Sequence, residues 1–180
     1  MRHRFVRLGL VRLGVVRLAA ALAFLGGFVC AVAQELPNDK AESISGKKLD
    51  FPSALRGVVT TCVFGFGKDS ADKVTVWLES LSSDNVNAWS IVNLESMPSG
   101  SRGVIRKTMT IGTPKNLLDR SLVISKDSKE WIRILEVTKL NMPVVVLFDR
   151  EGNIVWKRQG TFSSSIADEL KAKIAQLASK

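Results

Sequence analysis

The stretch between Pro143 and Trp156 constrains the fold of this chain more than any other. After the proline comes a valine-rich apolar run at 144–148, then a polar turn that contains Gly152, and then a second apolar run that begins at Ile154. Proline cannot donate to a strand ladder, but it is tolerated at the first residue of a strand. Two apolar runs joined by a short glycine-containing turn predict a β-hairpin.

Two further apolar runs, 58–66 and 86–94, predict buried strands. The first is apolar on both faces, which suits a central strand covered by helices on each side. The segment between them has helical spacing, with Asp69 expected as its cap and Asp72 in its first turn. The inner face of this helix is expected to consist of Val74, Trp77, Leu78 and Leu81. Strands joined by a crossover helix should be parallel.

The segment 98–120 has a less regular pattern. It contains several glycines and a proline, so one long helix is not expected there. Short helices are expected instead near 104–109 and 115–118. Residues 122–124 are apolar and are expected to form a short edge strand.

Two helices are expected in the last third of the chain. Asp127 and Glu130 have the spacing of a capping box, which predicts a short helix after 126. A terminal helix is expected to turn inward the apolar residues Ile166, Leu170, Ile174 and Leu177. The predicted order is β-α-β-α-β-β-α, a single α/β domain with a mixed sheet.

Residues 1–33 have the pattern of a secretory signal peptide. Arginines precede an apolar run at 18–32, and a small-x-small site ends at Ala33. The apolar run is shorter than the roughly 20 residues that a spanning helix needs. We expect cleavage after Ala33 and a secreted or periplasmic protein, with an uncleaved membrane anchor or a mitochondrial-type transit sequence as alternatives. Residues 34–48 are polar and are expected to be a flexible linker before one domain at 49–180.

Without residues 1–33 the chain has no histidine, no tyrosine and a single cysteine, Cys62. This composition excludes Ser-His-Asp and Cys-His catalytic sets, histidine-containing zinc sites and an intrachain disulfide. Because five arginines belong to the leader, 21 basic and 17 acidic side chains remain, with a net charge of +4. That charge does not indicate a nucleic-acid partner, and we expect neither a metal nor a cofactor.

The order of elements from 49 to 180 resembles the thioredoxin family. Met142-Pro143 stands where that family has a cis-proline facing its active site, and 148–155 is similar to the family's Asp-x-x-Gly-x-Ile turn. The resemblance implies a thioredoxin-like three-layer fold with a mixed central sheet. A more particular resemblance is to the mitochondrial ATP-synthase assembly-factor family, which is thioredoxin-like and has no redox cysteine pair.

The chemistry of the thioredoxin family requires a Cys-x-x-Cys pair, or one reactive cysteine, at the start of the first long helix. A helix N-terminus lowers the pKa of such a thiol. Here the corresponding stretch is Gly67-Lys68-Asp69-Ser70-Ala71-Asp72, which contains no cysteine and has two carboxylates. The redox motif is therefore missing, and the two carboxylates are interpreted as helix-start residues rather than as a cation site.

Two functional hypotheses follow. The first is a non-enzymatic binding or assembly module whose protein or peptide partner contacts the former active-site face, formed by Gly67, Lys68, Asp69, Ser70, Met142 and Pro143. The second is a single-cysteine thiol oxidoreductase or peroxidase that uses Cys62, although the apolar neighbours of that cysteine favour a buried thiol. Three further side chains are possible partner contacts, namely Trp156, Arg102 and Arg106.

Overall fold

A computed structural model describes residues 36–95 and 98–179, so the predicted signal peptide and its cleavage site lie outside the described residues. The described strands form one sheet with the order β2-β1-β5-β4-β3-β6-β7. The strands are β1 (Asp39–Ser43), β2 (Lys48–Phe51), β3 (Thr60–Gly65), β4 (Ala88–Asn93), β5 (Ser121–Ile124), β6 (Val144–Phe148) and β7 (Ile154–Gln159). β3, β4 and β5 are mutually parallel, whereas β6, β7, β1 and β2 join them by antiparallel pairing.

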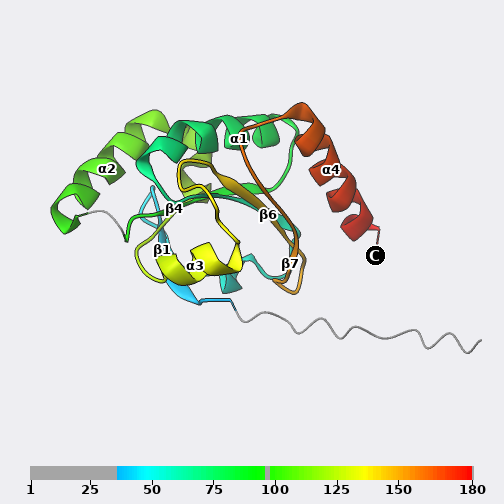
Figure 1. Cartoon of the computed structure of the whole chain (residues 1–180), viewed down its shortest axis with the longest axis horizontal. Helices are drawn as coiled ribbons and strands as arrows, with labels where there is room; N and C mark the ends of the chain where they lie inside the picture. The colour runs from blue at the N-terminus through cyan, green and yellow to red at the C-terminus, as the bar shows by residue number, and fades with distance from the viewer. Residues whose placement is uncertain (1–35, 96–97, 180) are drawn as a thin grey trace, which may run out of the picture. The chain divides into compact units, whose positions relative to one another are not determined.

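Helices lie on both faces of this sheet (Figure 1). The α-helices are α1 (Ala71–Ser83), α2 (Ser99–Gly112), α3 (Ser128–Ile134) and α4 (Ser164–Ala178), and short 3₁₀ turns are η1 (Ser53–Leu55), η2 (Lys68–Ser70) and η3 (Lys115–Arg120). None of the helices in the described ranges is both long and apolar enough to cross a bilayer.

The central strand β3 divides the core into two layers. All six of its residues are buried, and Cys62 pairs with Trp89 of β4 and Val146 of β6. On one face Cys62, together with neighbouring aromatic residues, packs against Trp131 of α3; on the other, Val63 packs with α1 and α4. The three-layer α/β fold with a mixed sheet is therefore confirmed, as are the predicted hairpin and the parallel crossover between β3 and β4.

The predicted flexible linker at 34–48 is wrong from Asp39 onward. Residues from Asp39 onward form β1 and the start of β2, and β1 pairs with β5 as well as with β2. The segment appeared to be a linker because it is polar, yet Asp39, Ala41 and Ser43 alternate toward the core. Because β5 pairs with β1 on one side and with β4 on the other, the prediction of an edge strand at 122–124 is also wrong.

One continuous helix, α2, replaces the predicted short helix near 104–109. It spans 14 residues despite Gly100 and Gly103, between Pro98 before its first residue and Pro114 beyond its end. A Cβ atom built on either glycine meets nothing within 4 Å, so packing does not require glycine at those positions. Two glycines cost helix propensity of about 1 kcal/mol each, which the helix tolerates.

The predicted cap at Asp69 is wrong, because Asp69 lies inside η2 and Ser70 is the residue before α1. Asp127 does occupy the N-cap position of α3, with a φ of 53°, but within the described residues its side chain makes no capping hydrogen bond. The amide of Ser128 instead donates to the carboxylate of Glu95, 2.5 Å away, from the loop after β4. Because Glu95 lies 33 residues before Ser128, no local spacing in the sequence predicts this cap.

Candidate functional site

Two loops meet at the end of the sheet where β3 finishes and β6 begins. Phe64 of β3 pairs with Val144 of β6, so the loop that follows β3 lies beside the loop that precedes β6. We call residues 67–70 and 140–143 together the junction. A Cβ atom on Gly67 would lie 2.9 Å from the Leu140 carbonyl oxygen, a distance that real Cβ atoms do not show. Glycine is therefore required at 67 for the two loops to touch.

Hydrogen bonds fasten the first loop of the junction. The buried Ser70 hydroxyl donates to the Gly67 carbonyl at 2.6 Å, and the Ser70 amide donates to the same oxygen at 3.0 Å. Lys73, in the first turn of α1, donates through Nζ to the Asn141 carbonyl at 2.8 Å and to the Asp69 carbonyl at 3.2 Å. Lys73 thus ties α1 to both halves of the junction.

The second loop of the junction is held from β7. Gln159 accepts hydrogen bonds from the amide and the hydroxyl of Thr138 at 3.0 and 2.7 Å, and it donates to the Lys139 carbonyl at 2.8 Å. The amide of Gly160 donates to the Pro143 carbonyl at 3.0 Å. Lys73 and Gln159 are not among the predicted site residues, because their partners lie 68 and about 20 residues away along the chain.

The predicted contact residues differ in exposure. Lys68 and Asp69 are exposed, Gly67 and Met142 are half-buried, and Ser70 and Pro143 are buried. Ser70 and Pro143 therefore shape the junction from inside, and treating them as surface contacts was wrong. Pro143 is covered because it leads directly into the buried strand β6.

Two further residues of the junction, Leu140 and Asn141, are exposed and complete its surface. Leu140 is 53% exposed and is the largest exposed apolar residue of the junction. The cis peptide bond of the described residues is Phe51–Pro52, so the cis geometry that the resemblance implied for Met142–Pro143 is wrong. The bend before Pro143 is a turn closed by the Met142 amide on the Lys139 carbonyl at 3.1 Å.

Cys62 lies in the core and not at the junction. It is fully buried in the middle of β3, among aromatic and aliphatic side chains. Burial raises the pKa of the Cys62 thiol well above its usual range, because the thiolate would lose its hydration there. The thiol is therefore protonated and shielded in the folded protein.

The three possible further contacts have intramolecular roles. Trp156 is only 7% exposed, packs with the α1 and α4 layer, and donates through Nε1 to Glu169 at 2.8 Å. Its prediction as an exposed contact is wrong, because α4 covers that face of β7. Arg106 forms an ion pair with Glu42 of β1, and Arg102 donates to the Glu95 carbonyl at 3.2 Å.

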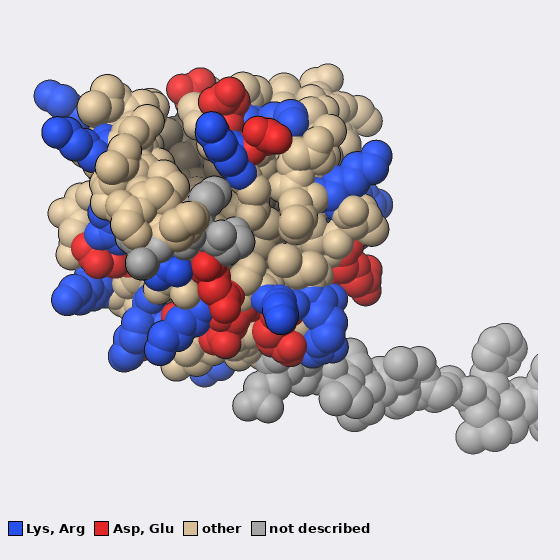
Figure 2. All heavy atoms as spheres, turned by 60° about the vertical axis from the view of Figure 1, so that its left-hand side comes forward, with Lys and Arg blue, Asp and Glu red and all other residues tan. Residues whose placement is uncertain are grey.

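Charged side chains of both signs are interspersed on the face that carries α2 (Figure 2). Among residues 36–95 and 98–179, no three side chains of histidine, cysteine, aspartate or glutamate are grouped to hold a metal ion. One acidic group in this part of the chain is buried. Burial, and then repulsion from Asp127, raises the pKa of Asp39 above its usual 3.8.

The sequence matches no protein-family model and no curated protein sequence. Its fold, however, is similar to several solved structures. The exposed lipoprotein thioredoxin Etrx1 of Streptococcus pneumoniae is 14% identical, with a TM-score of 0.53 over 78% of this chain and 100% of that one.

BsSco, a member of the Sco family of cytochrome c oxidase assembly proteins, is 13% identical, with a TM-score of 0.55 over 79% and 95% of the two chains. A protein of Chlorobium tepidum that is described as a thiol:disulfide interchange protein DsbE is 14% identical, with a TM-score of 0.52 over 78% of this chain and 93% of that one. The chain therefore has the thioredoxin-like fold of these redoxin-type proteins.

Proposed function

We propose that this chain is an exported thioredoxin-like domain without oxidoreductase activity, and that it binds a protein or peptide partner at the junction. One observation carries the proposal: the junction is tightly built but has no cysteine at the start of α1. Gly67 touches Leu140, and Lys73 bridges both loops. The thiol that the described residues do contain, Cys62, is buried in β3.

The surface of the junction is suited to a protein contact. Leu140 offers an exposed apolar side chain, and Lys68, Asp69 and Asn141 add exposed polar groups in the same two loops. An apolar centre with a polar rim is the usual anatomy of a protein interface. Because hydrogen bonds already fix both loops, little conformational entropy would be lost when a partner binds.

An assembly role and export each have separate support. BsSco, which is similar in fold, is described as a member of a family of cytochrome c oxidase assembly proteins, and Etrx1 is described as an exposed lipoprotein. Residues 1–33 have the composition of a secretory leader. These points favour a cell-envelope assembly factor as the specific form of the proposal.

The alternative is a single-cysteine thiol oxidoreductase or peroxidase that uses Cys62. Its support is that Etrx1 and DsbE, with the same fold, carry the names of thiol-active proteins. This alternative requires an opening of β3 that exposes Cys62. It predicts rapid labelling of the Cys62 thiol by a thiol reagent in the folded protein, whereas the proposed function predicts labelling only after unfolding.

The proposed function is tested by photo-crosslinking in cell-envelope extracts. A photoreactive residue at Lys68 should yield a discrete crosslinked product, and Leu140→Glu should abolish it. Val104→Glu is the matched control, since Val104 is 67% exposed on α2, and it should leave the product unchanged. Equal loss in both variants, or disulfide or peroxide turnover that disappears in Cys62→Ser, contradicts the proposal.

A further inference from the structure

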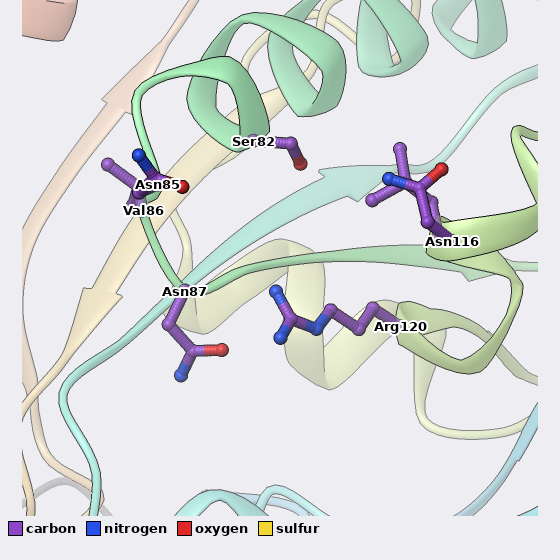
Figure 3. Close-up of a pocket in the computed structure, with 7 residues that line it drawn as sticks. Ser82, Asn85, Val86, Asn87, Asn116 and Arg120 are labelled. Atoms are coloured by element: carbon purple, nitrogen blue, oxygen red, sulfur yellow. The ribbon is translucent and has the colours of Figure 1, made fainter.

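A polar hollow lies where β4 and β5 begin, at the end of the sheet opposite the junction. Figure 3 shows the side chains that line it. Its walls come from the last turn of α1, the loop that leads into β4 and the η3 turn that leads into β5. These segments precede parallel strands, whereas the junction follows β3. The hollow has a volume of about 360 Å³ and is lined by the polar residues Ser82, Asn85, Asn87, Asn116 and Arg120. That volume is at the lower end of the range for small-molecule sites.

Ser82 supplies a hydroxyl that has no partner. Its Oγ is buried, and no group in the described residues lies within hydrogen-bond distance of it. Two other hydroxyls of α1 bond to the helix backbone: Ser83 donates to the Glu79 carbonyl at 2.9 Å and Thr75 to the Ala71 carbonyl at 3.2 Å. In Figure 3 the Ser82 side chain points across the hollow toward Asn116. A buried hydroxyl without a partner is costly, so a ligand that bonds to it is favoured.

Arg120 supplies an unopposed positive charge. Its side chain is exposed, and within the described residues it forms neither a hydrogen bond nor an ion pair. The guanidinium extends into the hollow toward Asn87 (Figure 3). Among residues 36–95 and 98–179, no acidic side chain lines this hollow, and the nearby Asp84 is already paired with Lys171 at 3.1 Å. A guanidinium in this setting is suited to bidentate binding of a carboxylate.

The asparagines have different roles. Asn87 is fixed, because its amide nitrogen donates to Thr60 at 2.9 Å and its oxygen accepts from the Trp89 indole at 3.2 Å. Asn85 and Asn116 are exposed, and within the described residues neither side chain forms a hydrogen bond. Each can therefore both donate and accept.

The end of α1 beside the hollow limits the negative charge of a ligand that can bind there. The carboxyl end of α1 carries a partial negative charge, which disfavours any anion near it, a dianion such as phosphate more than a carboxylate, and favours hydroxyl donors. The single positive charge of the Arg120 guanidinium neutralises the single negative charge of a monoanion. Val86 and Leu117 supply an apolar part of the lining for the carbon skeleton of a ligand.

We propose that this hollow binds a small organic acid that carries several hydroxyl groups, as a sugar acid does. Its carboxylate pairs with Arg120, and its hydroxyls bond to Asn85 and Asn116. The Ser82 hydroxyl joins them once its side chain rotates toward the ligand. The site is separate from the junction, so it does not depend on the proposed partner contact.

The test is a nuclear magnetic resonance titration of the isotope-labelled protein with sodium glucuronate and with sodium gluconate, beside glucose and inorganic phosphate. At least one sugar acid should shift the side-chain amides of Asn85 and Asn116 saturably and more tightly than glucose or phosphate does. Arg120→Gln should weaken that binding about 10-fold or more, in keeping with the loss of a charge-assisted bidentate pair. Lys129→Gln, which removes one exposed positive charge on α3, should not weaken it.

Three results overturn the proposal. They are the absence of saturable shifts with both sugar acids, binding of phosphate or glucose that equals theirs, and an affinity that Arg120→Gln leaves unchanged. Since Arg120 is exposed, the variant should keep its folded spectrum, and a spectrum taken before the titration checks this. Ser82→Ala provides a second variant, for which a reduced affinity with an unchanged fold is expected.

Discussion

The two ends of the parallel strands differ in how their polar groups are satisfied. At the junction, Gly67 and Leu140 are in contact and the Ser70 hydroxyl has a carbonyl partner at 2.6 Å. In the hollow at the opposite end, the Ser82 hydroxyl and the Arg120 guanidinium have no partner in the described residues. The comparison indicates that one end is built as a rigid outer surface and the other as a recess with free hydrogen-bonding capacity.

The largest expected effect comes from breaking the close contact at the junction. Gly67→Val should lower the free energy of unfolding by about 1–3 kcal/mol, because the new side chain collides with the Leu140 carbonyl and one loop must move. The φ of Gly67 is −134°, so backbone strain does not contribute. Urea unfolding measures the change.

Gly100→Ala on α2 is the control for Gly67→Val. A Cβ atom at Gly100 meets nothing within 4 Å, and alanine should raise stability by up to about 1 kcal/mol. A Gly67→Val protein as stable as the parent would show that the two loops of the junction are not in fixed contact.

A pair of serine substitutions compares the two ends directly. Ser70→Ala should cost about 1 kcal/mol, because the buried bond to Gly67 is lost. Ser82→Ala should be neutral or stabilising, since its hydroxyl has no partner in the described residues. Thermal unfolding of both variants measures the two changes in stability. An equal loss of stability in the two variants would contradict the proposed difference between the ends.

A smaller effect is expected from the lysine that bridges the junction. Lys73→Met keeps much of the side-chain volume but removes the bonds to the Asn141 and Asp69 carbonyls, at a cost of about 0.5–1 kcal/mol. Amide hydrogen exchange should accelerate in the loop 139–142 while the strand β3 stays protected. Lys129→Met on α3 is the control, and it should alter neither region.

The smallest expected effect at neutral pH concerns a buried acid outside both regions. The pKa of Asp39 is raised in the folded protein, so the folded state binds this proton more tightly than the unfolded chain does. Its contribution to stability is therefore present below pH 3.8 and is lost as the pH rises through the folded pKa. Asp39→Asn should be more stable than the parent at neutral pH, and the difference should shrink in acid. Urea midpoints across this range test the sign, and a gap that widens in acid contradicts it.

Local patterns predicted the elements that bury most of their residues. β3, the β6–β7 hairpin and the inner face of α1 follow from runs and spacings within about 15 residues, where hydrophobic periodicity is informative. The burial of Cys62 could likewise be predicted from its apolar neighbours. The polar strand β1 was not predicted, because it forms by pairing with β5, which lies about 80 residues later in the chain.

For the candidate site, the sequence indicated the two loops of the junction but not how they are joined. The resemblance to thioredoxins placed Gly67 and Met142 on one face, and the structure brings their loops together. Lys73 and Gln159, which hold those loops, interact across long sequence separations that no local spacing reveals. Trp156 was expected as a possible partner contact because it lies on an outer strand, whereas α4 covers it.

The sequence by itself determined the α/β class, the central strand, the hairpin and the absence of a cysteine at the start of α1. These depend on composition and on contacts between near neighbours in the chain. Tertiary structure alone decided the pairing of β1 with β5, the contact between Gly67 and Leu140, and the meeting of Ser82, Asn116 and Arg120 around one hollow. The physical reason is that hydrophobic periodicity reports which side of an element is buried, whereas the partner on that side is chosen by packing and backbone pairing across the whole domain.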